Sequence, residues 1–472
     1  MGLSFKAHNK RTAVITESGE KITYAQIERD SKALSDVISK RCLVFCLCTN
    51  TYASLLGYLT FLHNRIVPVM LDANLDLELL AELYEKYSPK YIWAPDTMQA
   101  DVLLKAQKRL KKHGYCLYES SDNIDYPLYD ELALLLTTSG STGSPKLVRQ
   151  SYSNILANTE SIIKYLEIDE NEITITTLPM SYTYGLSIIN THIHAGACIV
   201  LTEKTLMQKE FWTLFKQYNI TSFGGVPYIY EMLERLRFRR MNLPSLKTMT
   251  QAGGKLSPEL HREFAKYAVE NNKRFIVMYG QTEATARMSY LPHSESLNKC
   301  GSVGIAIPGG EFSLIDIDGD TINEPEKSGE LVYKGANVTL GYAECGEHLV
   351  KGDERNGILK TGDVAKRDAD GYYYIVGRLK RFLKLYGSRV NLDEMELLIN
   401  TNFPGIGCVC GGIDDKMYIF TEKEIDTEEL LHFVCEKTSF TRSAFRFVNI
   451  DEIPRNESGK VKYSELNKFY SK

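Results

Sequence analysis

The chain has 472 residues, of which 43% are hydrophobic and 25% charged, a composition typical of a globular protein with two or three domains. Lys and Arg number 56 and Asp and Glu number 60, so the formal net charge of −4 gives no support for a nucleic-acid or anionic-membrane partner. Two local basic runs, at 108–113 and 235–240, are interpreted as solvated helix faces.

The N-terminal residues carry no apolar stretch of the kind that a signal peptide needs. The most apolar long region, 42–71, is interrupted by polar residues, so it predicts buried strands and a helix rather than a membrane span. Without a secretory signal, the ten cysteines are expected to be reduced thiols. These features predict a cytoplasmic protein.

Apolar strand-like runs alternate with helical patterns over the first 280 residues. The runs that predict strands are 41–48, 65–71, 90–95, 172–179, 197–202, 220–227 and 274–280. The segments with helical periodicity are 53–62, 153–166, 210–218, 227–238 and 257–272. This alternation predicts α/β layers with mostly parallel strands.

The pattern changes after about Gly301, where turns rich in Gly and Asp separate short strands. Residues 301–377 therefore predict a small β-barrel-like subdomain, and 379–472 predict a small α+β domain. The predicted fold class is α/β: a large N-terminal domain, 1–378, of layered α/β subdomains that includes this β-rich part, followed by the C-terminal domain, 379–472.

A loop of sequence TTSGSTGSPKLV, 137–148, follows an apolar run that ends at Leu136. Its hydroxyls, its glycines and one lysine suit phosphate binding, because small residues let backbone N–H groups approach an anion. The residues concerned are Thr138, Ser139, Gly140, Ser141, Thr142, Gly143 and Lys146. The loop is not a Walker A motif, since Lys146 is followed by Leu147 rather than Ser or Thr. Taken alone, the loop leaves a Ser- and Gly-rich surface linker open as the lesser alternative to phosphate binding.

Seven motifs in order, from this loop to PRNESGK near the C-terminus, resemble the signatures of the adenylate-forming superfamily. That superfamily contains acyl- and aryl-CoA synthetases, adenylation domains of nonribosomal peptide synthesis, and luciferases. The matching segments are 137–148, 251–259, 278–284, 329–335, 359–363, 377–396 and 454–460. The resemblance covers nearly the whole chain and implies activation of a carboxylic acid by ATP, with release of pyrophosphate.

The resemblance implies a role for each motif in binding ATP and Mg²⁺. It places the loop 138–146 on the β- and γ-phosphates and assigns the carboxylate of Glu283 to Mg²⁺. It implies that Lys460 bridges the acid and the α-phosphate during adenylation. The other implied nucleotide contacts are Gly253, Gly254, Tyr279, Gly280, Gln281, Thr282, Asp363 and Arg378.

A second half-reaction is implied at a different face of the mobile C-terminal domain. The domain would turn about a hinge near Lys380 and present another surface to a phosphopantetheine thiol. Gly387 would line the path of this arm, and Lys384 matches a lysine that some relatives use in the second step. The thiol would belong to coenzyme A or to a separate acyl carrier protein.

The segment PMSYTYGLS, 179–187, falls where the superfamily forms its acyl pocket, which implies that Tyr182 and Tyr184 line it. Amino-acid-activating relatives carry an Asp in this segment, and its absence here weakens an α-amino acid substrate. Arg287 falls where relatives commonly have a small residue. It would pair with a second anionic or polar group of the acid if it points inward, and would be a surface residue if it points outward.

Two other functions stay open at this point. The acyl or aminoacyl group could pass to an amine or hydroxyl acceptor instead of a thiol. A non-catalytic nucleotide-binding protein on the same fold is the second alternative, and the presence of Lys460 and Glu283 counts against it.

Overall fold

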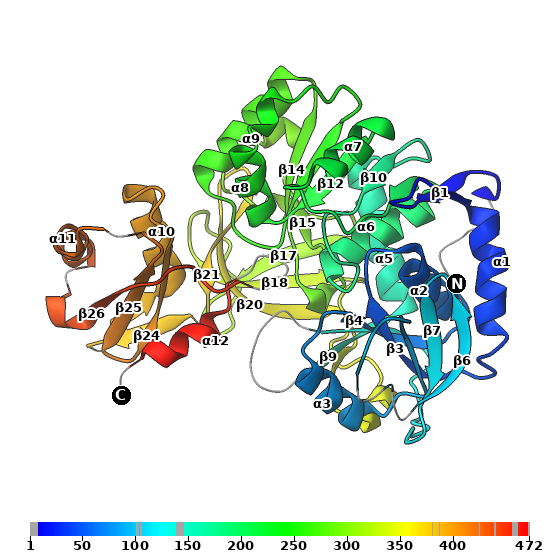
Figure 1. Cartoon of the computed structure of the whole chain (residues 1–472). Coiled ribbons are helices and arrows are strands. Elements are labelled where there is room, and N and C mark those ends of the chain that lie inside the picture. Colours follow the sequence, from blue (N-terminus) through cyan, green and yellow to red (C-terminus); the bar gives the residue numbers. More distant parts are fainter. Residues whose placement is uncertain are drawn as a thin grey trace. The chain divides into compact units, whose positions relative to one another are not determined.

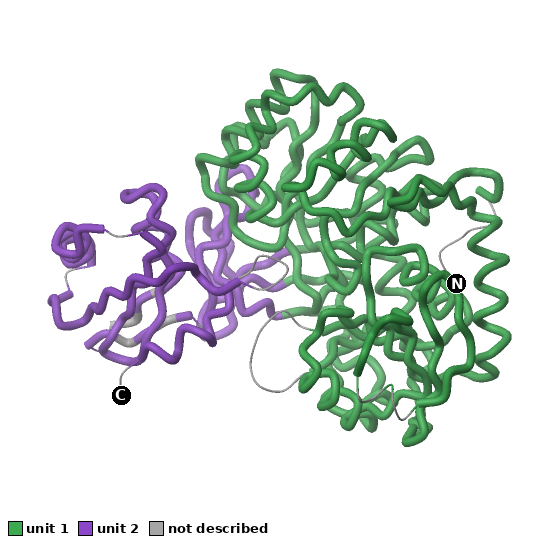
Figure 2. Tube along the Cα trace, viewed as in Figure 1, with its two compact units in different colours: residues 1–311, 333–359 green, residues 312–332, 360–472 purple. Residues whose placement is uncertain are grey.

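The computed structural model describes residues 8–100, 103, 106–137, 146–379, 381–386, 388–423, 425–438, 440–455 and 461–470. The chain divides into two compact units (Figure 2), of which unit 1 comprises 1–311 and 333–359 and unit 2 comprises 312–332 and 360–472. The predicted hinge residue, Lys380, lies outside the described residues, and the domain boundary beside it stays a prediction.

Two large sheets with helices around them form unit 1 (Figure 1). The described strands of the first sheet, in spatial order, are β16 (Ile305–Ala306), β15 (Ser289–Tyr290), β14 (Arg274–Tyr279), β13 (Thr248–Gln251), β12 (Ser222–Gly225), β10 (Ile173–Ile175), β11 (Cys198–Val200), β1 (Thr12–Ile15) and β2 (Lys21–Thr23). Those of the second are β19 (Gly341–Ala343), β9 (Leu147–Ser151), β8 (Leu132–Thr137), β4 (Val67–Asp72), β3 (Leu43–Cys48), β5 (Tyr91–Pro95), β7 (Tyr115–Glu119) and β6 (Gln107–Lys112).

Helices connect these strands in the predicted βαβ manner. They are α1 (Tyr24–Ser35), α2 (Tyr52–His63), α3 (Leu77–Tyr87), α5 (Tyr152–Leu166), α6 (Thr183–His194), α7 (Lys209–Gln217), α8 (Pro227–Arg235) and α9 (Pro258–Glu270). The helices begin where their sequences provide N-caps. At the start of α1, Thr23 and Gln26 form a capping box of reciprocal hydrogen bonds between side chain and backbone. α9 begins with Pro258, directly after Ser257, whose hydroxyl caps the helix. α2 is buried almost all round, which explains its uniformly apolar sequence.

The predicted parallel arrangement is confirmed where it matters for function. β12, β13 and β14 are parallel neighbours, with Gly225, Gln251 and Val277 in register. Their carboxyl ends therefore meet at one edge of the sheet, where ligands of open α/β folds usually bind. α8 and α9 lie beside these strands (Figure 1).

One local prediction is wrong, because the basic run 108–113 belongs to an edge strand, β6, and not to a helix face. Leu110 packs against the core, whereas the side chains of Arg109 and Lys111 are solvated and pair with Glu119 and Asp96. This two-residue alternation is that of a strand. Basic side chains on an edge strand also oppose pairing with other chains.

The described part of unit 2 contains three small sheets. β17 (Gly310–Ile315), β18 (Gly329–Gly335), β20 (Ile358–Arg367) and β21 (Tyr373–Arg378) form the short-strand region predicted after Gly301. Parts of β17, β18 and β20 belong to unit 1. The remaining strands are β22 (Phe382–Leu385), β23 (Ser388–Asn391), β24 (Cys408–Ile413), β25 (Lys416–Thr421) and β26 (Phe445–Asn449). The helices α10 (Leu392–Asn402), α11 (Thr427–Thr438) and α12 (Tyr463–Leu466) complete this predicted α+β part.

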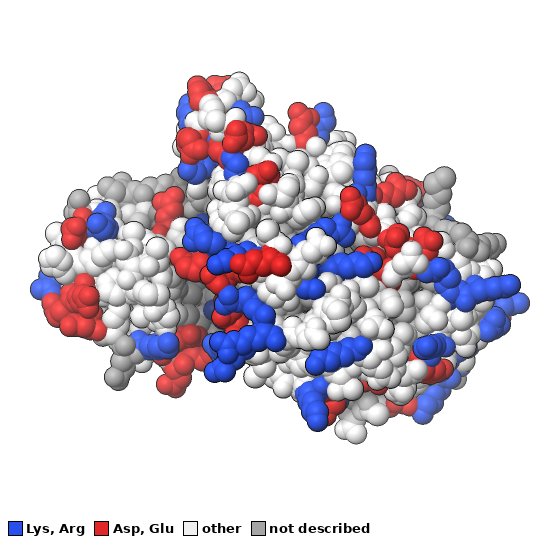
Figure 3. Space-filling view, turned by 90° about the horizontal axis from the view of Figure 1, so that it is seen from above, with Lys and Arg blue, Asp and Glu red and all other residues white. Residues whose placement is uncertain are grey.

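The surface carries charges of both signs. On the face drawn in Figure 3, basic and acidic side chains are interspersed, as expected for a net charge of −4. Within the described residues, no helix combines the length and the apolar character that crossing a bilayer requires.

Candidate active site

The turn after β14 holds the strongest group of predicted site residues. Tyr279 ends the strand, and the short helix η3 (Thr282–Ala284) follows it. Gly280 is required here, since a Cβ at this position would lie 1.8 Å from the carbonyl oxygen of Ala286. Gln281 donates to the hydroxyl of Tyr279 over 3.2 Å. The motif YGQTEA thus forms a tight turn at the carboxyl edge of the parallel strands.

Glu283 is fixed within this turn by contacts from distant parts of unit 1. Its backbone carbonyl accepts hydrogen bonds from the hydroxyl of Thr339 and the guanidinium of Arg355, both over 2.9 Å. Its carboxylate accepts one from the hydroxyl of Tyr342 over 2.7 Å. Burial and the adjacent Glu283 raise the pKa of Tyr342 to about 12, so this tyrosine is a neutral donor.

Lys146 reaches the same place from the end of the predicted phosphate loop. Its Nζ lies 4.1 Å from the ring centroid of Tyr342, and Arg355 lies over the same ring at 4.7 Å. Two cations and one carboxylate therefore surround Tyr342, a combination suited to phosphate and a divalent cation. Sequence reasoning found Lys146 and Glu283 but missed Tyr342 and Arg355.

The predicted adenine-flanking turn packs against the predicted acyl pocket. Gly253, which follows β13, has φ +85°, and a Cβ on it would lie 2.6 Å from the hydroxyl of Tyr182. Gly254 continues the turn, and the rings of Tyr182 and Tyr184 meet edge to face with centroids 6.5 Å apart. The parallel strands β13 and β14 bring the turn at Gly253 to the edge at which Thr282 also lies, and the two tyrosines come from the start of α6.

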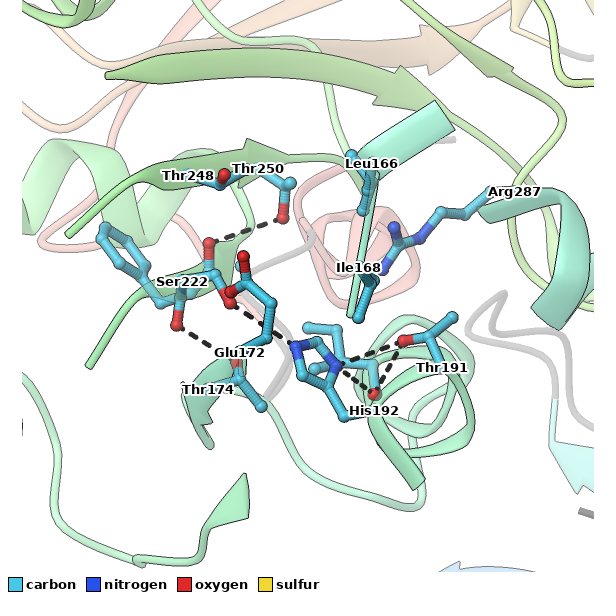
Figure 4. A pocket seen from close by; sticks show the side chains of 13 residues that line it. Leu166, Ile168, Glu172, Thr174, Thr191, His192, Ser222, Thr248, Thr250 and Arg287 are labelled. Atoms are coloured by element: carbon cyan, nitrogen blue, oxygen red, sulfur yellow. Dashed lines mark hydrogen bonds between the residues drawn. The ribbon is translucent and has the colours of Figure 1, made fainter. Parts of the chain in front are cut away.

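Arg287 is part of the lining of a cavity (Figure 4), and its guanidinium lies over the ring of Tyr184, 5.0 Å from the ring centroid. The hydroxyl of Tyr184 lies 2.8 Å from the Oγ1 of Thr250, another lining residue. Arg287 is only 2% exposed, which settles its orientation: it points inward. The other lining residues are Leu166, Ile168, Glu172, Thr174, Ile188, Thr191, His192, Ser222, Phe223, Gly224 and Thr248.

Asp363 and Arg378 are brought together within unit 2. They face each other across the antiparallel pair β20–β21, and the Nε of Arg378 lies 3.2 Å from a carboxylate oxygen of Asp363. Asp363 is 4% exposed, whereas the side chain of Arg378 is largely solvated. The buried carboxylate has the hydrogen-bond acceptors that ribose hydroxyls need.

Several predicted residues have no described side chain. Lys384 belongs to β22, and its side chain lies outside the described part of the structure. The residues that lie wholly outside it are Thr138, Ser139, Gly140, Ser141, Thr142, Gly143, Gly387 and Lys460. Their assigned roles stay predictions.

Comparison with known proteins gives one consistent result. A sequence model described as "AMP-binding enzyme" matches residues 4–343. Oxalate–CoA ligase of Arabidopsis thaliana is 29% identical over 360 residues, covering 72% of this chain and 68% of that protein. Peroxisomal OPC-8:0-CoA ligase 1 of the same plant is 26% identical over 515 residues, covering 99% and 92%.

A similar fold is found in o-succinylbenzoate CoA synthetase from Bacillus subtilis, solved with an acyl-adenylate intermediate. The TM-score is 0.80 at 21% identity, with 99% of this chain and 98% of that chain covered. The same protein with ATP and magnesium ion gives a TM-score of 0.78 at 22% identity, covering 97% and 96%. The predicted fold class is thereby confirmed.

Proposed function

Since the chain belongs to the AMP-binding enzyme family, we propose that it is an AMP-forming acid–thiol ligase. It activates a carboxylic acid with ATP to an acyl-adenylate, releases pyrophosphate, and transfers the acyl group to a phosphopantetheine thiol. The observation that carries this proposal is the convergence of Lys146, Glu283 and Arg355 around Tyr342, at the edge where the strands of the nucleotide motifs end.

The first step requires an anionic carboxylate to approach the α-phosphate while charge develops on the leaving pyrophosphate. Preorganised cations and donors lower such a barrier, by roughly 2.7–4 kcal/mol for a single donor in a water-excluded site. Lys146 and Arg355 are the described cations of this cluster, and Thr282 adds a hydroxyl. Lys460 would supply a further cation that contacts both reactants.

Glu283 is a fitting ligand for Mg²⁺. The described residues contain no group of three or more His, Cys, Asp or Glu that could hold a metal ion by themselves. Mg²⁺ is commonly held by one or two carboxylates, with substrate phosphates and water completing the shell. When bound, the ion would neutralise charge on phosphate oxygens. Tyr342 would orient the carboxylate through its 2.7 Å hydrogen bond.

The remaining assignments place the nucleotide and the acceptor. Tyr279 and the Gly253–Gly254 turn would flank adenine, with Gly280 and Gln281 shaping the turn beside it. Asp363 and Arg378 would bind the ribose, and the C-terminal domain, 379–472, would turn about Lys380 to bring Lys384 and Gly387 to the thiol. Both plant relatives are named as CoA ligases, which favours coenzyme A over a separate acyl carrier protein.

Product analysis with and without a thiol tests the proposal. The protein is incubated with ATP, Mg²⁺ and a panel of carboxylic acids, and AMP, pyrophosphate and acyl products are measured by mass spectrometry. We expect multiple turnovers and an acyl-CoA only when coenzyme A is present. A product formed only with a pantetheinylated carrier protein would reassign the thiol. Efficient transfer to an added amine or alcohol, with no thioester, would contradict acid–thiol ligation.

A further inference from the structure

Two buried arginines of unit 1 differ sharply in their surroundings. Arg149, 0% exposed, donates to the carbonyls of Leu340, Tyr342, Lys351 and Gly352 and pairs with Glu354. The hydrogen bonds and the ion pair of the Arg149 guanidinium thus hold β9 to the segments around it. Arg287 is 2% exposed, but no carboxylate of the described residues lies within ion-pair distance of it.

The guanidinium of Arg287 has few hydrogen-bond partners. Its Nε is buried and has no hydrogen-bond partner among the described residues. One terminal nitrogen lies 3.4 Å from both the hydroxyl of Tyr165 and the sulfur of Met278, which are long and weak contacts. The cation is otherwise stacked on the ring of Tyr184, 5.0 Å from its centroid. Burying a charge without a partner is costly, so a fold retains it where a ligand supplies the partner.

The backbone holds this arginine in position. The carbonyl of Arg287 accepts from the side-chain amides of Asn158 over 2.8 Å and of Asn337 over 3.2 Å. The preceding Thr285 has φ +65°, unusual for a β-branched residue, and its hydroxyl donates to the carbonyl of Asn337 over 2.7 Å. The segment that follows Glu283 is therefore fixed so that the side chain of Arg287 enters the cavity (Figure 4).

The rest of the cavity lining is largely apolar, with several hydroxyls, one histidine and the carboxylate of Glu172. Figure 4 shows Thr250, Ser222 and Glu172 across the cavity from Arg287. Glu172 is already engaged, since it accepts a hydrogen bond from the hydroxyl of Thr221. His192 uses its Nδ1 to donate to the carbonyl of Ile188 over 2.8 Å, and burial lowers its pKa, so it is neutral. Among the described lining residues, Arg287 is thus the charged group that remains available to bind a ligand of opposite charge.

Resting on the proposed function, we propose that the substrate acid carries a second carboxylate, which binds Arg287 in this cavity. A guanidinium binds a carboxylate through two parallel N–H donors, and in Arg287 the Nε–H is available for this. The hydroxyls of Thr250 and Ser222 border the same space. The cavity is small, about 20 Å³, so only a compact end group of the acid fits beside Arg287.

The test compares matched acids in the AMP-release assay with ATP and coenzyme A. Succinate, glutarate and adipate are each paired with their monoamide, which keeps the shape and removes the second charge. The wild type should prefer one of the diacids over its monoamide by roughly 100-fold in kcat/KM. Arg287→Gln should lose about that factor for the diacid and change little for the monoamide, and Arg287→Lys should fall between them.

Matched arginine variants separate recognition from a structural role. Arg274→Gln removes an arginine of β14 that pairs with Glu167 and does not line the cavity, so it should keep the acid preference of the wild type. Thermal unfolding should show that Arg287→Met leaves Tm unchanged or raises it, because an unpaired buried cation is removed. Arg149→Met should lower Tm clearly, because its carbonyl partners and Glu354 lose their donors.

Two results would overturn the inference. The first is a wild type that uses monoamides or unsubstituted monoacids as well as diacids. The second is an Arg287→Gln variant that loses activity equally with every acid and also loses thermal stability, which would make Arg287 structural. Absence of AMP formation with every acid in the wild type would contradict the proposed ligase function instead, so the two failures are distinguishable.

Discussion

The carboxylate of Glu283 is positioned by a tyrosine hydroxyl, and that contact allows its charge to be tested separately from its place in the fold. In Glu283→Gln the amide oxygen still accepts from Tyr342, so Tm should change little. The variant loses the negative charge that we assign to Mg²⁺. We expect kcat for AMP formation to fall by roughly 10²–10³-fold. We also expect that half-maximal activity will require a higher Mg²⁺ concentration.

Tyr342→Phe is the matched control for Glu283→Gln, since it removes the positioning hydrogen bond and keeps the carboxylate. It should lower kcat less than Glu283→Gln does. If Glu283→Gln kept the wild-type dependence on Mg²⁺, the assignment of Glu283 to the metal would be wrong. If both variants instead lost Tm to the same extent, the cluster would be structural rather than catalytic.

At the scale of single residues, the sequence predicted which motif residues carry charge or hydroxyls. It did not predict which other residues contact them. Glu283 and Lys146 were found because they lie in motifs, whereas Tyr342 and Arg355 were missed because their role arises only when β19 and the segment after it meet the turn at 282–284. The orientation of Arg287 could not be predicted either. It follows an irregular turn with a positive φ at Thr285, and neither strand nor helix periodicity applies there.

At the scale of elements, α9 is tied to the segment after η4 (His293–Glu295) by one buried histidine. The Nδ1 of His261 accepts from the backbone N–H of Gly301 over 3.1 Å, so this nitrogen must be unprotonated, and Nε2 lies 3.3 Å from the hydroxyl of Ser296. Burial is the main cause that lowers the pKa of His261 to about 4, and the nearby Arg262 adds to it.

This histidine predicts a pH dependence of stability. The pKa is lower in the folded than in the unfolded chain, where it is about 6.5, so the unfolded chain binds the proton first. The contribution to the free energy of unfolding is fully present above pH 6.5 and declines as the pH falls toward 4, by about 3 kcal/mol in total. Denaturant unfolding between pH 7.5 and 4 should show this loss.

His261→Asn keeps an acceptor for Gly301 without the titration, so its stability should depend less steeply on pH than that of the wild type. His432→Asn, on an exposed position of α11, is the control and should behave as the wild type. Equal slopes for wild type and His261→Asn would contradict the proposed linkage. Since His192 is also buried with a lowered pKa, part of the pH dependence should persist in His261→Asn.

The predicted helices and strands of unit 1 were largely correct, because burial in the core determines where apolar residues occur along each element. All six residues of β3 are buried, as a central parallel strand requires, and its apolar run was recognised as a strand. β6 was misassigned because charge dominated its composition, and its alternation is visible only once Leu110 is known to face the core. Strand order depends on contacts between distant segments, which no local pattern contains.

At the scale of the whole molecule, we assign two partial reactions to one chain. The residues of unit 1 that we assign to the nucleotide form a cluster, and unit 2 contains the Asp363–Arg378 pair and the segment with Lys460. Family membership links these parts in one reaction, acid activation through an adenylate. Thiol transfer would follow after the domain turns about Lys380, so it should not depend on Lys460.

The most direct test of this account is acid-dependent exchange of labelled pyrophosphate into ATP. Exchange requires that adenylation be reversible and needs no thiol, so it isolates the first step. The wild type should exchange label with ATP, Mg²⁺ and at least one carboxylic acid, and Lys460→Ala should abolish this exchange while still forming thioester from a supplied acyl-adenylate. Absence of exchange with every acid tested, from a folded protein that binds ATP, would contradict adenylate formation.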